Sequence, residues 1–466
     1  MTLREGLAWE TVTAYAETHS TESLVARLSS VQECIGLIEF AGRNGYTICP
    51  RGAGYTYADM ILNDRQIILD ISRMNRLLRW DPDAGIMTVE PGVRLSDIFL
   101  TALPWNWTLP ACPGGMAVTV GGAVSNNVHG KDSWKNGNFG AQVNGLKLLT
   151  ASGEILSLDG QSNPALFRAV IGGMGLFGII IEVTLQLKKV PSPFVEVSTA
   201  PSRDIWESVE KLEDAKADSD FSVAWVDAFS TGRALGRGYV VKAKWAGDGE
   251  GMDRERLSKS LTLPTKIFGL LPAAPTWYLL RPFFRPSFLR PANSANYLLT
   301  RLKGMRKERM LFTEYNFMHN RIPELKRVFR PHGFLELQPL IPRRSGAPAV
   351  AEVFRLCQRH GFQSLLCGFK AHSGDDFMIS YSGDGYSIGV SLQRRGRDPE
   401  KTKLFARALF EHTLNCGGKA FLAKDELLPR DIFERMYPQY KEFLEVKRAV
   451  DPEGLFKSDM YRRLMA

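Results

Sequence analysis

The residues best suited to chemistry lie in a stretch that begins at Ala111 and ends at Gly140, ACPGGMAVTVGGAVSNNVHGKDSWKNGNFG. It holds seven glycines and four asparagines, together with His129 and two lysines. An ordered glycine costs conformational entropy, so such a dense run inside a globular chain needs a reason. A flexible linker is one reason, but Gly/Ser linkers rarely carry Val, Trp and Phe as well. We therefore interpret the stretch as a loop that brings backbone N–H groups close to a phosphate or carbonyl oxygen of a ligand.

Two further glycine-rich segments have the same character. The predicted strand 46–50 runs directly into RGAGYTYAD, residues 51–59, and GGMGLFGII covers residues 172–180. A strand that enters Gly-x-Gly suggests a phosphate-binding loop, although glycines after strands also form ordinary turns. The dinucleotide fingerprint of the parallel βαβ fold needs a third glycine and a following apolar helix, and Tyr-Thr-Tyr-Ala-Asp stands there instead. A Rossmann fold is therefore disfavoured.

The elements that must position these loops follow from hydrophobic periodicity. Up to residue 187 the chain reads as α+β, with a short lead-in, helices expected over 31–42, 95–103 and 164–170, and further strands expected over 66–71, 86–93, 143–149, 154–158 and 183–187. Beyond residue 194, strands are expected around Phe369 and over 195–198, 221–226, 239–243, 310–317, 334–341, 379–381 and 386–392, with helices over 349–360 and 401–415. Alternating apolar strands with two helices predict an antiparallel sheet covered on one face.

Length and composition limit the class of protein. A chain of 466 residues is too long for one ordinary core, so two or three domains are expected. The first residues carry acids and lack the apolar run of a signal peptide, and no window approaches the ~20 apolar residues of a membrane span. The six cysteines are scattered without a CxxC pair. This argues against a zinc site or a disulfide framework, fits reduced thiols in the cytoplasm, and leaves no metal site to be expected.

One segment is unusually basic. Residues 266–309 hold nine basic residues and one acid, interleaved with leucines and with aromatic residues such as Phe268 and Trp277. Its five prolines exclude one long helix. Nucleic-acid readers usually contain a recognisable module, and since none is present no nucleic-acid partner is expected. Two interpretations stay open: a surface that contacts a membrane, because rings settle at the headgroup level and cations meet anionic lipid, or an ordinary packed connection.

Taken together, these motifs resemble the vanillyl-alcohol-oxidase/PCMH class of FAD-dependent oxidoreductases. PRGAGYTYAD is similar to the pyrophosphate loop of that class, PGGMAVTVGGAVSNNVHGKDSWKNGNFG to its second flavin loop and GGMGLFGII to its third. DPEGLFKSDMYRRL resembles the end of the sugar-lactone oxidase branch. The resemblance implies an α+β fold with a two-part, PCMH-type FAD-binding domain over residues 1–192. It also implies a substrate domain over 193–418, built on an antiparallel sheet covered by helices, and a C-terminal segment, 419–466, that returns to the FAD-binding domain.

Within this class, NVHGKDSWKNGNFG, GFLELQPLIP, GGKAFLAKD, MYPQY and VDPEGLFKSDMYRRL are closer still to the oxidases that act on decaprenylphosphoryl-ribose in arabinan synthesis. This resemblance implies oxidation of a secondary hydroxyl of a polyprenyl-phosphate-linked pentose to the keto sugar. That step is the first half of an epimerisation, which a separate NAD(P)H-dependent reductase completes. We expect a cytoplasmic protein, peripheral on the inner membrane, with contact through residues 266–309. Two alternatives stay open: a soluble aldonolactone or alditol oxidase, and a flavin-free binding protein that kept the fold.

The resemblance also implies roles for individual side chains. Lys424, in FLAKD, matches a lysine placed over the flavin, either as a base whose pKa burial lowers or as a cationic anchor. His129 is expected to line the flavin ring and Tyr57 to face the substrate. Four further residues match substrate-binding positions, and a phosphate on the substrate suits the two lysines among them: Lys131, Gln338, Lys370 and Ser387. Without the resemblance, a surface lysine, a structural histidine and a packed tyrosine are the plain alternatives.

The cofactor-binding positions of the class carry over onto the glycine loops and their neighbours. They are Arg51, Gly52, Ala53, Gly54, Tyr55, Thr56, Tyr57, Asp59, Gly114, Thr119, Val120, Gly121, Gly122, Asn126, Asn127, Val128, His129, Ile180 and Phe421. Many relatives tether FAD through a histidine directly after Gly-x-Gly; Tyr55 stands there, so non-covalent FAD is expected. The active-site thiol of the class is replaced by Gly389, an asparagine contact by Ser387 and a tyrosine over the flavin by Phe421. These departures bear on the identity of the sugar more than on the reaction type.

Overall fold

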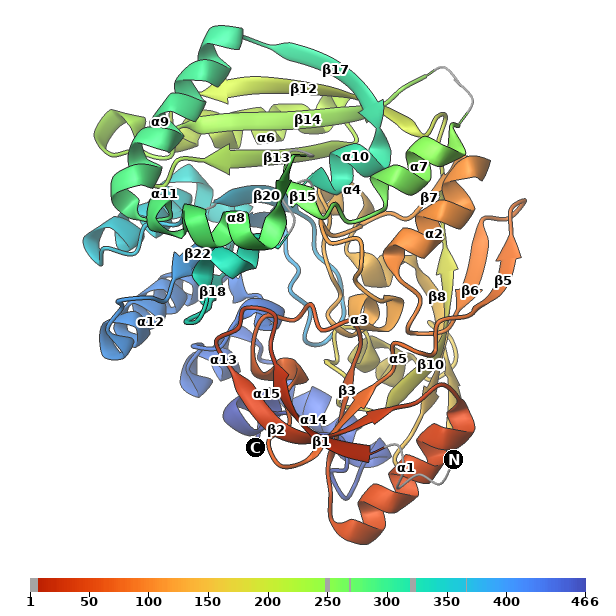
Figure 1. The fold of residues 1–466 in the computed structure, drawn as a ribbon. Coiled ribbons are helices and arrows are strands. Elements are labelled where there is room, and N and C mark those ends of the chain that lie inside the picture. Colours follow the sequence, from red (N-terminus) through yellow and green to blue (C-terminus); the bar gives the residue numbers. More distant parts are fainter. Residues whose placement is uncertain (1–6, 248–251, 268–269, 319–323, 366) are drawn as a thin grey trace.

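The computed structural model describes residues 7–247, 252–267, 270–318, 324–365 and 367–466. Two sheets lie in the half that carries the N-terminal residues, and a large antiparallel sheet forms the other half (Figure 1). Helices cover the sheets and connect them, so the expected α+β fold is confirmed. One apolar core cluster runs from the five-stranded sheet into the large sheet, which joins the two halves into one packed body.

The first sheet combines an N-terminal hairpin with two parallel strands. Its order is β1 (Leu7–Thr13), β2 (Ser20–Arg27), β4 (Ile67–Asp70) and β3 (Ile48–Arg51), in which β4 pairs in parallel with both neighbours. Helix α1 (Val31–Asn44) starts at a Ser30–Glu33 capping box and ends at Gly45, whose φ of 69° suits glycine. The sequence predicts only a lead-in and a helix here, and that expectation is wrong for the hairpin. The reason is that β1 is a largely exposed edge strand without an apolar run.

The second sheet is five-stranded and antiparallel. Its order is β5 (Leu77–Asp81), β6 (Ile86–Val89), β10 (Ile179–Gln186), β8 (Val143–Leu149) and β9 (Ile155–Leu158). The connections contain η2 (Asp59–Ile61), α2 (Leu95–Ala102), α3 (Val120–Ser125), α4 (Ser133–Asn136), η4 (Phe139–Gln142), α5 (Pro164–Val170) and the short pair β7 (Trp107–Thr108) and β11 (Lys188–Lys189). All three glycine-rich segments therefore leave or enter strands of the first two sheets.

The third sheet has eight strands, and every pairing in it is antiparallel. Its order is β17 (Arg306–Leu311), β12 (Phe194–Ser202), β14 (Gly238–Trp245), β13 (Phe221–Val226), β20 (Gly368–His372), β21 (Gly385–Ile388), β19 (Pro339–Pro342) and β23 (Lys419–Ala420). Helices α6 (Ile205–Asp218), α11 (Gly346–Arg359) and α12 (Pro399–Asn415) pack against it and against each other. A separate two-stranded ribbon, β18 (Phe334–Leu337) with β22 (Val390–Gln393), continues two of these segments beyond the sheet.

Two expected strands are wrong, and two others are interrupted. Residues 312–316 form helix α10 (Phe312–Asn316) rather than part of a strand, because a short segment buried on most sides has no periodicity that separates helix from strand. Residues 379–381 lie in a loop that side chains hold, since Ser380 and Ser382 both donate to Asp375. The strand expected over 334–341 breaks at Gln338, and the one over 386–392 breaks at Gly389. Both interruptions lie beside the site described below.

The basic segment adds helices to the rim of the large sheet. It consists of β15 (Lys266–Ile267), β16 (Leu271–Pro272), α8 (Ala273–Leu280), η6 (Arg281–Phe283) and α9 (Pro286–Lys303), with α7 (Arg254–Ser260) before it and η8 (Leu325–Phe329) after it. Phe268 lies outside the described residues. In Figure 1, α9 stands at one edge of the molecule with α8 at its foot. None of the helices that the structure describes combines the length and apolarity needed to cross a bilayer.

The C-terminal segment runs through η10 (Leu422–Lys424), α13 (Arg430–Met436), α14 (Tyr440–Val450) and α15 (Asp459–Leu464). It packs against the first sheet. Ile48 donates its N–H to Leu455 O at 2.8 Å and forms a parallel bridge with Phe456, which is fully buried among residues of that sheet and α1. The segment thus starts as the edge strand of the third sheet and ends against the first.

Candidate active site

Lys424, Glu336 and Tyr57 form one contact group where the two halves meet. The Lys424 ammonium and the Glu336 carboxylate form an ion pair, and Nζ lies 5.0 Å from the centroid of the Tyr57 ring. The backbone fixes this arrangement, because Tyr57 N–H donates to Ala423 O at 2.9 Å. Burial and then the negative charge of Glu336 raise the pKa of Tyr57 well above its usual value. The structure therefore brings together two residues singled out from the sequence and adds a carboxylate that the sequence did not reveal.

The N-terminal hairpin supplies an aromatic wall to the same place. Tyr15 lies in the turn after β1, with its ring 5.2 Å from Tyr55 and 5.1 Å from Tyr57, measured between centroids. Phe334, at the start of β18, closes the group with its ring edge-on to Tyr57 at 5.5 Å. Burial raises the pKa of Tyr15 to about 12, so its hydroxyl stays protonated. Tyr57 thus contacts the rings of Tyr15 and Phe334 as well as the Lys424 ammonium.

His129 is paired with Gln338. Its Nε2 is 2.9 Å from Gln338 Nε2, whereas its buried Nδ1 has no hydrogen-bond partner among the described residues. Burial, followed by the positive charges of Lys370, His372 and Lys424, lowers the pKa of His129 well below its usual value. The imidazole is therefore neutral. With the Gln338 amide as donor, its proton stands on Nδ1, where it is available to a ligand.

A second neutral imidazole lies behind the first. The rings of His372 and His129 are 4.8 Å apart in an edge-on arrangement, and His372 Nε2 is 2.7 Å from Ser387 Oγ. Burial and Lys370 lower the pKa of His372 to about 3. Phe421 also lines the pocket, with its ring 5.3 Å from that of His129. Ser387 is buried and its hydroxyl contacts His372, so Ser387 affects the site by orienting that histidine.

Lys131 and Lys370 bring positive charge to the site, and neither forms an ion pair with a described residue, although Asp132 attracts both and Glu336 attracts Lys370. Lys131 Nζ donates to the backbone O of Asn316 at 2.6 Å and to its Oδ1 at 3.3 Å. Burial first, and then the neighbouring Lys370, lowers the pKa of Lys131 to about 7. Burial, followed by the charge of Lys424, likewise lowers the pKa of Lys370, on β20, to about 8. An anion bound between the two lysines would reduce the free-energy cost of keeping both ammonium groups charged away from water.

The first two glycine-rich loops pack directly on one another. A side chain at residue 52 would place its Cβ 2.2 Å from Thr119 Oγ1, so only glycine allows this approach. Gly121 is similarly close to Pro91, with 2.8 Å between the two Cβ positions, and Val120 is buried beside it. At Gly122, in contrast, an added Cβ would meet only Thr119 Oγ1, at 3.2 Å. The loop therefore packs tightly against the protein at residue 121 and leaves space beside its backbone at residue 122.

Two proposed cofactor residues hold the loops in place through protein contacts. Asn127 is fully buried, donates to Asp375 and Ser380 and accepts from Gly140 N–H. Asp59 accepts two hydrogen bonds from Arg463. The other residues expected at the cofactor lie along the glycine-rich segments and are buried or half-buried: Ala53, Gly54, Thr56, Gly114, Val128 and Ile180. Asp59 and Asn127 thus act on a cofactor indirectly, by fixing the backbone of the loops that would bind it.

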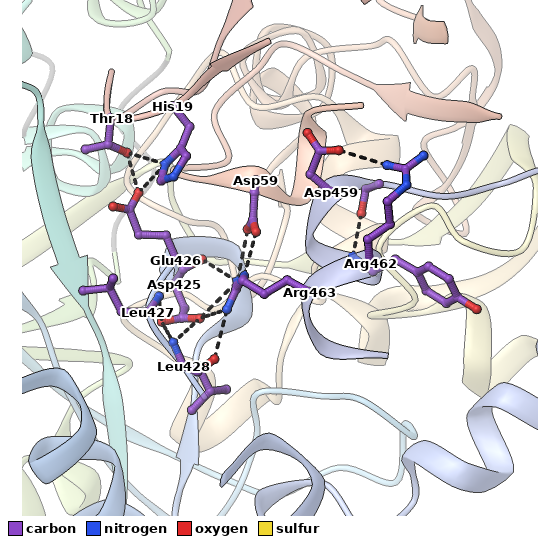
Figure 2. Close-up of polar contacts among 12 residues, drawn as sticks. Thr18, His19, Asp59, Asp425, Glu426, Leu427, Leu428, Asp459, Arg462 and Arg463 are labelled. Carbon is purple, nitrogen blue, oxygen red and sulfur yellow. Dashed lines mark hydrogen bonds and ion pairs between the residues drawn. The ribbon is translucent and has the colours of Figure 1, made fainter. Parts of the chain in front are cut away.

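An ion-pair cluster around Arg463 ties the C-terminal segment to both sides of the site (Figure 2). The guanidinium donates to Asp59 at 2.7 Å, and its NH1 lies 3.3 Å from Asp425, the residue after Lys424. Burial alone would lower the pKa of Arg463, but the two carboxylates outweigh it and raise the pKa. Glu426, next in the chain, accepts from His19 of the N-terminal hairpin at 2.9 Å. The loops that carry Tyr57 and Lys424 are thus clamped by one residue from helix α15.

The residues present fit the FAD that the motifs imply. Three buried polar atoms, Arg51 Nε, Asn126 Oδ1 and His129 Nδ1, have no hydrogen-bond partner among the described residues, and all belong to the first two loops. One cavity is lined by Met60, Asn126, Gly172, Met174, Tyr381, Phe421 and residues near them. Ile180 lines a second cavity with residues of the third loop. The second and third glycine-rich segments and the stretch before Lys424 therefore line one cavity together, and the first two segments hold unsatisfied donors and an acceptor suited to a polar ligand.

Sequence reasoning did not find Tyr15, Glu336, His372 or Asn316, although each touches a proposed site residue. Glu336 and Gln338 alternate along one segment, and this spacing places both on the same side of an extended chain. That spacing is the only signal that points to Glu336. Tyr15 and Asn316 reach the site from the hairpin and the helix that the sequence did not predict, so no local pattern indicates them.

Comparison with known proteins gives two family matches. Residues 23–159 match the FAD-binding domain model, and residues 322–464 match the D-arabinono-1,4-lactone oxidase model. The first match spans the first two glycine-rich loops, and the second spans Gln338, Lys370 and Lys424. Since the first describes FAD binding, FAD is the cofactor.

Whole-length relatives are oxidoreductases of sugars and sugar lactones. The chain is 30% identical to decaprenylphosphoryl-β-D-ribose oxidase of Mycolicibacterium smegmatis over 91% of its length and 90% of that protein. It is 24% identical to L-gulonolactone oxidase of Bos taurus, over 92% of each chain. It is 23% identical to L-gulono-1,4-lactone dehydrogenase of Mycobacterium tuberculosis, over 95% of this chain and 96% of that one.

Proposed function

Since the chain belongs to the family of FAD-dependent sugar and sugar-lactone oxidases, we propose that it oxidises a secondary hydroxyl of a polyprenyl-phosphate-linked pentose to the keto sugar. The observation that supports this proposal is the pair Lys131 and Lys370, whose ammonium groups form no ion pair with a described residue and whose pKa values desolvation lowers. Asp132 and Glu336 compensate these charges only in part, so a neutral lactone adds nothing to that compensation, whereas the phosphate of a lipid-linked sugar does. A separate NAD(P)H-dependent reductase would then return the ketone as the epimeric alcohol.

Each side chain has a defined part in this proposal. Bound FAD supplies the hydride acceptor. Lys424, held by Glu336 beside the Tyr57 ring, anchors the oxygen of the reacting hydroxyl, and Glu336 is suited to accept its proton. His129 donates from Nδ1 to a second oxygen of the sugar or to the cofactor, and Gln338 fixes the orientation of its ring.

The remaining residues shape the site around the substrate. Lys370 and Lys131 bind the phosphate, and the wall formed by Tyr15, Tyr57 and Phe334 excludes water from the reacting carbon. Ser387 and His372 set the contour of the pocket behind His129.

The test is anaerobic reduction of the purified yellow protein. Adding a polyprenyl-phosphate-linked pentose should bleach the flavin absorbance, and L-gulono-1,4-lactone should do so far more slowly. Bleaching by the lactone alone would replace this proposal with the lactone oxidase alternative. His129→Ala should keep its flavin and lose turnover. Gly52→Val, which forces a side chain against Thr119, should lose the flavin itself.

Two variants separate the two roles open to Lys424. Lys424→Arg keeps a cation beside Glu336 but cannot act as a base, whereas Lys424→Met removes both functions. An anchor predicts that the arginine variant keeps measurable turnover and that the methionine variant does not. Equal loss in both would assign Lys424 the role of base.

The mode of FAD attachment is settled by acid precipitation. Tyr55 stands where many relatives carry the tethering histidine, and its ring packs against Tyr15. We therefore expect all the FAD in the supernatant after precipitation. Flavin retained in the pellet would mean a covalent link to another residue.

A further inference from the structure

Helix α9 exposes most of its large apolar side chains and turns Asn293, Ser294 and Tyr297 toward the protein. Five residues at helical spacing form a continuous outer stripe: Phe288, Ala292, Ala295, Leu299 and Leu302. Phe288, Leu299 and Leu302 are 48%, 54% and 75% exposed, which is unusual for three large apolar side chains on one helix face. We call this set the outer stripe. Its position is the reverse of that on an ordinary surface helix, whose apolar face packs on the core.

The inner face of α9 shows that this orientation is fixed by specific contacts. Asn293 donates to Asp227 at 3.4 Å, and Arg237 donates to Ser294 Oγ at 2.6 Å. The Arg237 guanidinium also lies over the ring of Tyr297, 5.0 Å from its centroid. Because Tyr297 is buried and these hydrogen bonds face the large sheet, α9 cannot rotate its outer stripe inward without losing them.

The outer stripe is continuous with further exposed apolar residues. Phe283, 50% exposed, packs its ring edge-on against Phe288 with 5.1 Å between centroids. Leu270, before α8, and Leu279, in its last turn, are 78% and 75% exposed. Figure 1 places α8 at the foot of α9, on the same edge of the molecule.

The charge around this apolar surface has one sign. Residues 266–307 contain eight basic residues and no acid. Arg285, Arg290, Arg301 and Lys303 lie on α9 or next to it and are exposed. A second copy of this chain would bring two such basic surfaces together and be repelled. Leucine and phenylalanine side chains bordered by arginines match instead the headgroup region of a bilayer that contains anionic lipid.

We propose that α9 and the end of α8 form a docking surface for an anionic lipid bilayer. The outer stripe enters the boundary between headgroups and acyl chains, and the flanking cations contact lipid phosphates. The surface lies close to the active site, since Trp277 and Phe284 belong to the same apolar cluster as Tyr57 and Phe334. A lipid-borne sugar would then reach Lys424 without leaving the membrane. That last step rests on the proposed function; the docking itself does not.

Co-sedimentation with vesicles tests the docking. The intact protein should bind vesicles of phosphatidylglycerol and phosphatidylcholine, bind pure phosphatidylcholine weakly, and be released by high salt. Leu299→Asp combined with Leu302→Asp should weaken binding by at least about tenfold, because two apolar side chains that enter the bilayer are replaced by carboxylates that anionic lipid repels. Leu404→Asp is the matched control: this leucine is 63% exposed on α12, away from the surface, and its replacement should leave binding unchanged.

Three outcomes would overturn the docking proposal. They are absence of binding to anionic vesicles, an equal loss in the Leu404 control, and a dimer in lipid-free solution that the stripe variant abolishes. The last would make the surface an interface between two copies. Failure of the proposed function is read separately, because flavin content and bleaching by a detergent-solubilised lipid-linked sugar should be unchanged in the stripe variant.

Discussion

Two regions of this molecule bury positive charge, and they treat it in opposite ways. At the C-terminal clamp, Arg463 lies between two carboxylates, Asp59 and Asp425, which raise its pKa despite burial. In the active site, burial and neighbouring lysines outweigh the attraction of Asp132 and Glu336, and the pKa values of Lys131 and Lys370 fall to about 7 and about 8. The clamp is complete without a ligand, whereas no described carboxylate forms an ion pair with either lysine, although Asp132 attracts both and Glu336 attracts Lys370.

The difference separates groups that hold the fold from groups kept for binding. Removing a buried cation that is paired with carboxylates is strongly destabilising, because the carboxylates are then left buried without a counter-charge. A buried cation without one costs stability, and a chain that retains it gains only when an anion arrives. On this reasoning the clamp is structural and the lysine pair binds substrate. The predictions below test that assignment.

The largest effect is expected at the clamp. Arg463→Ala leaves the nearly buried Asp425 and Asp59 facing each other, and should lower the free energy of unfolding by about 3 kcal/mol. Urea unfolding of the FAD-loaded protein measures this. Arg462→Ala is the control, because Arg462 pairs with the more exposed Asp459, and should cost less than about 1 kcal/mol. Equal losses would mean that burial of the cluster contributes nothing.

A moderate effect is expected on substrate binding at Lys370. Lys370→Met removes a cation but no ion pair, so KM for the phosphate-bearing substrate should rise about tenfold, corresponding to about 1.4 kcal/mol, with flavin content unchanged. Steady-state kinetics with Lys370→Arg as the conservative variant checks this, since arginine retains the charge. If KM stays the same in Lys370→Met, the phosphate binds elsewhere.

The same lysine makes stability depend on pH. Its pKa in the folded protein is about 8, below that of the unfolded chain, so the unfolded state binds more protons above pH 8. Stability should therefore rise with pH above about 8, by an amount on the order of 1 kcal/mol. Comparing unfolding at pH 8 and pH 10 tests this: Lys370→Met should show a smaller rise than the intact protein. An identical pH dependence in the intact protein and in Lys370→Met would mean that folding does not lower the pKa of Lys370.

The smallest effect is expected at the edge of the clamp. Glu426 raises the pKa of His19, so this pair stabilises the fold below the usual pKa of histidine and stops doing so as pH rises through the raised value. Because His19 is 44% exposed, His19→Gln should cost no more than about 0.5 kcal/mol, and only in mildly acidic solution. Thermal unfolding at pH 5.5 and pH 8 distinguishes this from a loss at both pH values.

Much of the fold could be predicted from the sequence because its signals are local. The capped helix α1, the hairpin of β8 and β9 and the helices α11 and α12 all have strong periodicity or turn residues. Helix α10 could not be predicted, because four of its five residues are buried and show no alternation. The hairpin of β1 and β2 was hidden for the opposite reason, since β1 is largely exposed.

The site divides in the same way. Residues within a glycine-rich motif, such as His129, could be found because the motif itself is unusual in composition. Glu336, Tyr15 and Arg463 act across long separations in sequence and look like ordinary residues where they stand. Only the packing of the two halves shows that Tyr15 lies against Tyr57, or that Arg463 holds the residue beside Lys424.

The clamp also fixes the order in which this protein can mature. Asp59 is synthesised 404 positions before its partner Arg463. The backbone contacts of Ile48 with Leu455 and Phe456 likewise form only after the C-terminal segment has been synthesised. While the ribosome is still translating, the loop that carries Tyr57 lacks the ion pairs and the backbone bridge that fix its final position. We therefore expect flavin to be bound late in biosynthesis. Nascent chains stalled before residue 463 should remain colourless, even though all three glycine-rich loops have long since emerged.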